Sequence, residues 1–316
     1  MLYPSIEPFA RGMLDVGQGH SIYWEQCGNP QGQPIVFLHG GPGAGCTPKA
    51  RRWFNPQHYR VVLLDQRGCG RSTPHASTQH NTLEHLVQDL EQLRKLLRIE
   101  HWLLCGGSWG STLALAYTRL HRTRVQGLVL RGVFTAEPVE LDWLYKPGGV
   151  NQVFPQPWQA FASALGAVEP TQLLNAYAQQ LHSNDVSQVL AAALAWCAWE
   201  DALSSIHPDA RPSAPDVPRC LSMARISSHM FMHDPWLGAN AQVWSAQSLL
   251  GLPGIIVQGQ FDMVTPAQTA WSVHQAWPGS QLRMVHEAGH ATADPALGQA
   301  LVCALDEMAT MVRHPI

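Results

Sequence analysis

The sequence has little charge and contains no run of like charges. Charged residues make up 14% of the 316 residues, and the formal net charge is −3. This balance predicts no polyanion-binding surface and therefore no nucleic-acid partner. No apolar stretch reaches the roughly 18 residues that a membrane span needs. The N-terminus also lacks the basic start and apolar segment of a signal peptide. We therefore expect a soluble, cytoplasmic protein that has no membrane partner.

Spacings typical of metal sites and disulfide frameworks are missing as well. The seven cysteines are scattered and form no CxxC pair, which indicates free thiols in a reducing compartment. The sixteen histidines show no HExxH motif and no clustered metal spacing. The glycine-rich segment at 37–43 contains no G-x-G-x-x-G and precedes no GK[ST], so it does not fit a phosphate-binding loop. We expect neither a metal ion nor a cofactor.

Short apolar segments alternate with helical patterns in much of the chain. Residues 82–97 carry an apolar stripe at helical spacing. Strands that are apolar throughout, alternating with helices, predict an α/β fold with a mostly parallel sheet covered on both faces. The predicted strands are Ile35–His39, Val61–Asp65, Trp102–Gly106, Gly127–Leu130, Gly254–Gln258 and Leu282–His286.

The alternation stops between residues 135 and 245, where the pattern is helical and rich in Trp and Ala. We predict a core formed by residues 1–134 and 246–316, with a helical cap inserted at 135–245. The cap contains ten acidic and four basic residues. Either this is a solvated acidic face, or the cap favours a cationic group on a substrate.

The segment GGSWGS at 106–111 lies between an apolar strand and a predicted helix. Gly106-x-Ser108-x-Gly110 matches the nucleophile elbow, in which a sharp strand-to-helix turn exposes a serine hydroxyl. Glycines two residues before and after the serine relieve the collisions that such a turn creates. We predict that Ser108 is a catalytic nucleophile.

A serine hydroxyl needs a base to remove its proton, and in this fold the chain order is serine, acid, histidine. The segment IIVQGQFDMVTP supplies Asp262 just after a strand, and LRMVHEAGHATADP supplies His290 after the next. The rival groups are less well placed. His286 lies at a strand edge, Asp294 follows the histidine, and Asp234 lies in the predicted cap. Ser108, Asp262 and His290 are therefore predicted to form a triad.

The tetrahedral oxyanion of such a reaction needs backbone N–H donors. One should be the N–H of Trp109, the residue after the nucleophile. The other should come from FLHGGPG at 37–43, where glycines allow close approach of the backbone. We expect Gly41 to be the second donor, and Gly40 remains an alternative.

Several motifs together identify a family resemblance. HGGPG, DQRGCGRSTPH, GGSWGSTLALAY, LVLRGVF and WCAWE resemble the prolyl iminopeptidases over nearly the whole chain, cap included. These are serine peptidases of the α/β-hydrolase fold. The resemblance implies a metal-free enzyme that cleaves an N-terminal proline from a peptide.

The resemblance also implies a substrate pocket. In the family, acidic cap residues hold the free amine of the substrate, and one of them closes a W-x-x-W-E motif, which places Glu200 in that role. The family's second acid is the glutamate of a segment R-I-E-x-H-Y-F. The matching segment here is RISSHMF, in which Ser227 replaces that glutamate. The family also has a W-Y-Y segment near the pocket; here it reads WLY, so Leu144 replaces the first tyrosine. Arg131 and Phe134 match pocket-forming residues of the family.

These departures leave the substrate open at this point. A substrate ammonium that meets one carboxylate instead of two loses a charge-assisted hydrogen bond, which is worth roughly 1.5–3 kcal/mol of binding free energy. The protein is expected to be a serine hydrolase that releases N-terminal proline. The alternatives are a related amidase or esterase with altered specificity, and, more remotely, a non-catalytic binding protein. The expected ligand is a peptide, or a small amide or ester, that carries a free amine.

Overall fold

The computed structural model describes residues 1–206, 214–237 and 243–313. Its centre is a sheet with the strand order β1-β2-β4-β3-β5-β6-β7-β8. The strands from β3 to β8 run parallel, and β1 and β2 are antiparallel to their neighbours. The prediction of a mostly parallel α/β sheet is confirmed. The bounds are β1 Ala10–Gly17, β2 His20–Gly28, β3 Gln33–Leu38, β4 Tyr59–Leu64, β5 Trp102–Ser108, β6 Val125–Val133, β7 Gly254–Gly259 and β8 Ser280–Val285.

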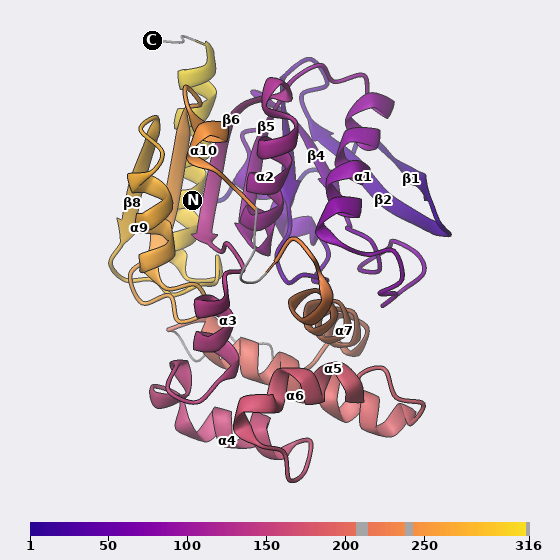
Figure 1. The fold of residues 1–316 in the computed structure, drawn as a ribbon. Coiled ribbons are helices and arrows are strands. Elements are labelled where there is room, and N and C mark those ends of the chain that lie inside the picture. Colours follow the sequence, from indigo (N-terminus) through magenta and orange to yellow (C-terminus); the bar gives the residue numbers. More distant parts are fainter. Residues whose placement is uncertain (207–213, 238–242, 314–316) are drawn as a thin grey trace.

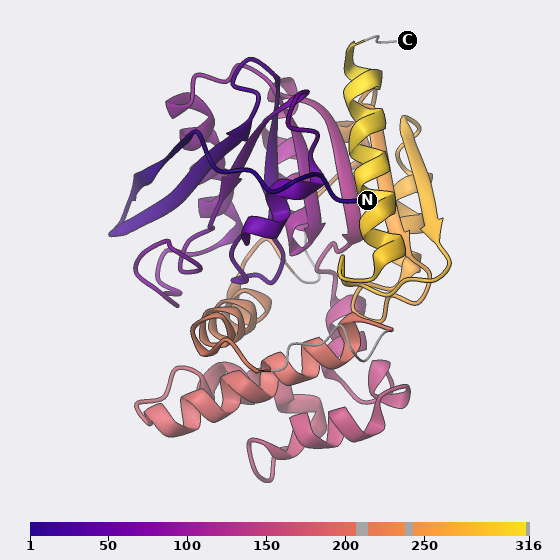
Figure 2. The same ribbon diagram turned by 180° about the vertical axis from the view of Figure 1, so that it is seen from behind.

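Helices cover both faces of the sheet (Figures 1 and 2). Successive side chains of a strand point to opposite faces. In β3, Val36 and Leu38 belong to the core layer beneath α1, α2 and α9, whereas Ile35 and Phe37 belong to the layer beneath α10. The sheet is therefore buried on both faces, as its apolar strands require. These helices are α1 Leu83–Leu96, α2 Trp109–Leu120, α9 Ala267–Gln275 and α10 Pro295–Arg313, and the 3₁₀ helix η1 Pro48–Trp53 lies on the α10 side.

Local signals account for the first two helices. The helix predicted at 82–97 is α1, which begins after Thr82, whose hydroxyl accepts the N–H of His85. Such a cap satisfies one of the free N–H groups of the first turn. Helix α2 follows directly on β5, and Ser108 is the residue between them.

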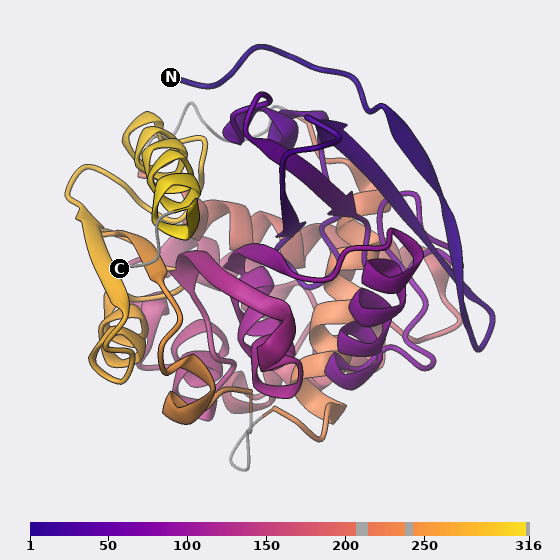
Figure 3. The ribbon, with the colours of Figure 1, turned by 90° about the horizontal axis from the view of Figure 1, so that it is seen from above.

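The hairpin of β1 and β2 was not among the predicted strands. Along β1 the side chains alternate between exposed and partly buried, so the sequence offers no apolar run there. The two strands form one edge of the sheet, and β8 forms the other (Figure 3). This edge lies away from Ser108, which ends the central strand β5.

Between β6 and β7 the chain forms helices α3 to α7, which lie beyond the carboxyl ends of the parallel strands (Figure 1). We refer to helices α3 to α7 as the cap helices; the domain boundaries at 134/135 and 245/246 remain a prediction. Asp209 and Arg211, which enter the charge balance of this segment, lie outside the described residues. None of the helices described is long and apolar enough to cross a membrane. The bounds are α3 Pro138–Tyr145, α4 Pro155–Ser163, α5 Leu173–Gln180, α6 Val186–Ser204 and α7 Val217–His233, with a short α8 Ala246–Leu249 after them.

Candidate active site

Ser108 occupies a turn that most residues avoid. It is the last residue of β5, and its backbone angles are φ 56° and ψ −126°. A Cβ on Gly106 would collide with the carbonyl of Gly110, and one on Gly110 would collide with the carbonyl of Leu38. Glycine is therefore required on both sides of Ser108 for the chain to turn this sharply. The geometry is that of a nucleophile elbow.

His290 and Asp262 form a buried pair. His290 Nδ1 lies 2.8 Å from Asp262 Oδ2. The other carboxylate oxygen of Asp262 accepts the N–H groups of Val264 and Thr265 at 3.0 and 2.8 Å. Burial alone would raise the pKa of Asp262. The charge and hydrogen bond of His290, together with the hydrogen bond from the Thr265 N–H, instead hold this pKa below its ordinary value. Asp262 is thus kept ionised, as the orienting group of a catalytic histidine must be.

The rival groups serve other contacts. Asp234 accepts the N–H groups of Leu83 and Trp236, so it caps the start of α1. Asp294 accepts the N–H of Gly289 and the hydroxyl of Ser205. His286 is exposed and lies against Gln260.

A cavity of about 170 Å³ opens between the elbow and the cap helices. Ser108 and His290 contribute to its wall on the sheet side, and Glu200 contributes on the cap side. Most of the rest is apolar, so the cavity suits a small apolar group that carries a charge at one end. The other lining residues are Gly40, Gly41, Ala44, Arg131, Phe134, Leu144, Tyr145, Asp201, Leu203, Ser204, Arg219, Met223, Phe231, Val264 and Thr265.

Glu200 is held by two donors from an aromatic cluster. Its Oε1 accepts the indole N–H of Trp196 at 2.7 Å and the hydroxyl of Tyr145 at 3.1 Å. The two rings stack with their centroids 4.9 Å apart. Burial raises the pKa of Glu200 to about 7, although these hydrogen bonds and the charge of Arg219 oppose the shift. A cation that binds beside Glu200 would stabilise its ionised form and offset the cost of burying the charge.

Three further residues of the predicted pocket also line the cavity: Arg131, Phe134 and Leu144. Phe134 is fixed through its backbone, because its N–H donates to Ser111 Oγ and its carbonyl accepts from Thr112 Oγ1. Leu144 presents an apolar side chain, while its carbonyl accepts the indole N–H of Trp199.

Ser227 is not brought into the cavity. Its side chain is fully buried, and its hydroxyl donates to the carbonyl of Pro42 at 3.1 Å. Of the five residues predicted to bind substrate, the other four line the cavity, whereas Ser227 contacts the 37–43 segment.

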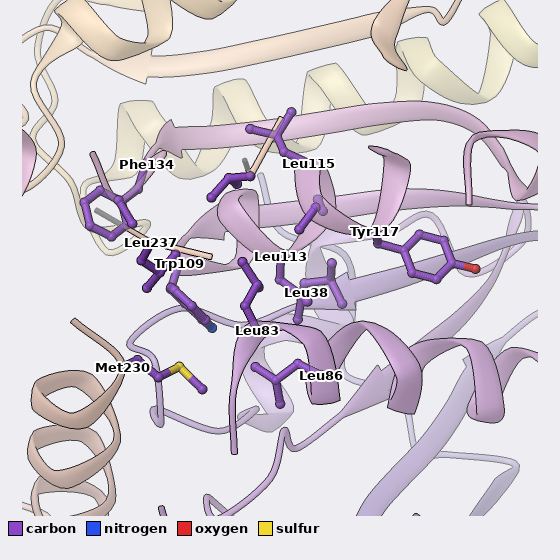
Figure 4. Close-up of a cluster of buried hydrophobic side chains, with 14 of the residues drawn as sticks. Leu38, Leu83, Leu86, Trp109, Leu113, Leu115, Tyr117, Phe134, Met230 and Leu237 are labelled. Atoms are coloured by element: carbon purple, nitrogen blue, oxygen red, sulfur yellow. The ribbon is translucent and has the colours of Figure 1, made fainter. Parts of the chain in front are cut away.

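The segment at 37–43 lies beside the elbow. Gly40 and Gly41 line the cavity together with Ser108. A Cβ on Gly40 would come within 3.3 Å of the Ser108 Cβ, a tight contact, so glycine leaves more room beside the serine than any other residue would. The side chain of Trp109 points away into the core, as Figure 4 shows, where its indole N–H donates to Gln66. The amides of Gly41 and Trp109 remain the predicted oxyanion donors.

A cap helix also touches the histidine loop. The carbonyl of Ser204, at the end of α6, accepts the N–H groups of His290 and Ala291 at 2.9 and 2.7 Å. Because this contact spans 86 residues of sequence, no local pattern could have indicated it. The sequence analysis also did not single out Tyr145 and Thr265. Their signals were nonetheless present, since Tyr145 follows Leu144 in WLY and Thr265 stands three residues after the triad acid.

The cysteines are free, as predicted. Burial raises the pKa of the Cys105 thiol to about 12, which makes it a core residue and a poor nucleophile. Within the described residues, no group of three or more His, Cys, Asp or Glu side chains is arranged to hold a metal ion.

Comparison with known proteins agrees with this geometry. A family model described as the alpha/beta hydrolase fold matches residues 33–295. A proline iminopeptidase from Neisseria meningitidis is 44% identical over 308 residues, covering 97% of this chain and 98% of that protein. One from Xylella fastidiosa is 45% identical over 308 residues, covering 96% and 98%. One from Arabidopsis thaliana is 42% identical over 315 residues, covering 98% and 83%.

Solved structures share the fold at low identity. The chain superimposes on an esterase from Rhodococcus sp. with a TM-score of 0.65 at 18% identity, covering 96% of this chain and 99% of that one. It superimposes on a proline iminopeptidase-related protein of Thermus thermophilus with a TM-score of 0.60 at 23% identity, covering 95% and 98%. The elbow, the buried His–Asp pair and the full-length relatives together establish that this chain is a member of the proline iminopeptidase family of α/β-hydrolase-fold enzymes.

Proposed function

We propose that this protein is a cytoplasmic serine aminopeptidase that releases proline from the N-terminus of peptides through an acyl-enzyme. His290 removes the proton of the Ser108 hydroxyl as the serine attacks the scissile carbonyl, and Asp262 orients the imidazole. The N–H groups of Gly41 and Trp109 stabilise the tetrahedral oxyanion. His290 then protonates the leaving amine, and a water molecule repeats the sequence on the acyl-enzyme.

The observation that carries this proposal is the position of Glu200 in the same cavity as Ser108 and His290. A peptide whose first carbonyl lies at Ser108 has its N-terminal ammonium only a few bonds away, on the cap side. A carboxylate there distinguishes an aminopeptidase from a peptidase that cuts within the chain. Phe134, Leu144 and Phe231 supply apolar walls for a proline ring.

An amidase or esterase of other specificity is the second candidate. It is favoured by Ser227, which stands where the family has its second acid and which contacts Pro42 outside the cavity. It is also favoured by Arg219, a cation that lines the cavity close enough to lower the pKa of Glu200. Both features weaken the attraction for an ammonium.

The two candidates differ in how they respond to Glu200→Gln. For an aminopeptidase, KM for proline p-nitroanilide should rise roughly ten- to a hundredfold, because a hydrogen bond to a charged group is lost. Hydrolysis of p-nitrophenyl acetate, which carries no amine, should hardly change. The matched control is Asp142→Asn, which alters a half-exposed cap acid paired with Lys146. Equal responses of the two substrates to Glu200→Gln would contradict the aminopeptidase and favour the esterase.

A fluorophosphonate probe tests the catalytic role itself. The wild-type protein should be labelled on Ser108, and Ser108→Ala should not be labelled. A wild-type protein that resists labelling would be a binding protein built on the hydrolase fold.

A further inference from the structure

Two buried serines connect a cap helix to the glycine-rich loop beside the nucleophile. Ser222 Oγ lies 2.9 Å from the carbonyl oxygen of Gly43 and 3.1 Å from that of Arg219 in its own helix, so its one proton goes to the nearer acceptor, Gly43. Ser227 Oγ donates to the carbonyl of Pro42 at 3.1 Å. Both serines lie on α7, and their exposed fractions are 1% and 0%. Water therefore cannot replace either bond if the hydroxyl is removed.

The helix and the loop are also in direct backbone contact. Gly43 has φ 92°, and a Cβ there would lie 2.7 Å from the carbonyl oxygen of Ser222 and 3.0 Å from Met223 Cα. Only glycine allows α7 to approach this closely. Met223 extends from the same turn of α7 into the wall of the cavity.

The sheet side of the loop is anchored independently. Gln66 Nε2 donates to the carbonyl of His39 at 2.9 Å, and the backbone N–H of Gln66 donates to His39 Nε2 at 3.0 Å. Gly41 thus lies between an end held by the core, at His39, and an end held by α7, at Pro42 and Gly43. Because Gly41 is the residue between the two anchors, release of the Pro42–Gly43 end changes the backbone angles at Gly41 and, through them, the direction of its N–H.

We propose that Ser222 and Ser227 are positioning residues that hold the Gly41 N–H in the direction of the oxyanion. This inference rests on the proposed function, because it concerns the oxyanion hole of that reaction. Ser227 then has a role of its own in this chain: instead of meeting a substrate amine, it couples the cap to the reactivity of Ser108. An oxyanion donor acts mainly in the transition state, so a displaced donor lowers kcat and leaves KM nearly unchanged.

The test compares Ser222→Ala, Ser227→Ala and the double variant with Ser228→Ala. Ser228 is a matched control, because it is equally buried on the same helix, but its hydroxyl donates within that helix, to the carbonyl of Arg225 at 3.3 Å. With p-nitrophenyl acetate, each single variant should lose roughly 3- to 10-fold in kcat, the range of one buried hydrogen bond, with KM within about twofold. The double variant should lose more than either, and Ser228→Ala should resemble the wild type.

A transition-state analogue separates positioning from general loss of structure. A simple alkyl trifluoromethyl ketone forms a hemiketal with Ser108, and its oxyanion occupies the proposed hole. Its affinity should fall in parallel with kcat across the variants, while the affinity of free proline, a ground-state ligand, stays constant. If circular dichroism shows that the double variant does not fold, the two single variants are enough to test the positioning role.

The outcomes are distinguishable. Suppose that the wild type reacts with fluorophosphonate, but Ser222→Ala and Ser227→Ala match Ser228→Ala in kcat and in ketone affinity. This result would overturn the positioning role and leave the proposed function standing. A wild type without labelling would overturn the proposed function instead.

Discussion

Arg131 contacts His290 at two points. Its Nη1 donates to the His290 carbonyl at 2.7 Å and lies 3.2 Å from His290 Nε2. Nε2 is the nitrogen that faces the serine in a triad. An arginine N–H can approach it only when Nε2 carries no proton, which leaves the imidazole proton on Nδ1, facing Asp262. The guanidinium therefore agrees with the tautomer that catalysis needs, but it occupies the Nε2 lone pair that must accept the Ser108 proton, so it has to yield that position to the serine hydroxyl during the reaction.

Replacing this arginine should slow catalysis. Arg131→Gln removes the guanidinium hydrogen bond to the His290 carbonyl, which holds the histidine loop in place. The value of kcat/KM for p-nitrophenyl acetate at neutral pH should fall about tenfold, in line with a hydrogen bond to a charged group. Arg131→Lys keeps a charged donor and should lose less. A Gln variant with the wild-type kcat/KM for this ester, but a changed KM for proline p-nitroanilide, would show that Arg131 acts on substrate only.

Ser108→Ala and His290→Ala should each remove nearly all turnover and leave the fold intact. The members of a triad act as a unit, so the double variant should be little worse than either single variant. Single-turnover rates with an activated ester, together with far-UV circular dichroism, check both statements. Losses that multiply in the double variant would argue against a shared step.

Glu200 should give free-amine substrates a pH dependence of their own. Burial raises its pKa to about 7, so below that pH the carboxyl is neutral and attracts an ammonium poorly. The ratio of kcat/KM for proline p-nitroanilide to that for p-nitrophenyl acetate should therefore rise with pH through about 7, until the substrate amine itself loses its proton at roughly pH 8 and above. The ratio cancels the contribution of His290, which both substrates share. Glu200→Gln should make the ratio flat; a wild-type ratio that is already flat would remove Glu200 from amine recognition.

Tyr145→Phe should shift that midpoint upward. The tyrosine hydroxyl donates to Glu200 and lowers its pKa, so without it the carboxyl ionises at higher pH. Tyr177→Phe is the matched control, because Tyr177 is a buried cap tyrosine whose hydroxyl donates to the carbonyl of Phe161 instead. The same pH series of substrate ratios measures the shift, and an equal effect of both variants would indicate repacking of the aromatic cluster.

Glu200 should also make the fold less stable at alkaline pH. Its pKa in the folded protein, about 7, lies above the ordinary 4.5, so the folded state binds the proton more tightly. The stabilisation of the fold by this bound proton is fully present below about pH 4.5 and is lost as the pH rises through about 7. As the pH rises from 5 to 8, the Tm of the wild type should therefore fall relative to that of Glu200→Gln. A difference in Tm that is constant with pH would contradict the raised pKa.

The parts of the site that could be predicted are those with a local signal. Ser108 lies between two glycines and between a strand and a helix, and each of these features is visible within a dozen residues. His290 and Asp262 each follow an apolar strand, and parallel strands bring their carboxyl ends to one edge. By contrast, the β1–β2 hairpin was missed because neither strand has a continuous apolar run: β1 alternates between exposed and partly buried residues, and the largely buried β2 is interrupted by polar residues.

Short stretches of sequence were therefore enough to predict the fold and the family and to propose the order of the triad, because periodicity, glycine spacing and motif order are local features. Tertiary structure alone decided what Ser227, Arg131 and Ser204 do. Each contacts a group at least 86 residues away: Ser227 meets Pro42, Arg131 meets His290, and Ser204 meets the N–H of His290. The physical reason is that a sequence pattern reports whether a side chain is buried. The direction in which a buried hydroxyl or guanidinium points depends on the partner that packing brings to it.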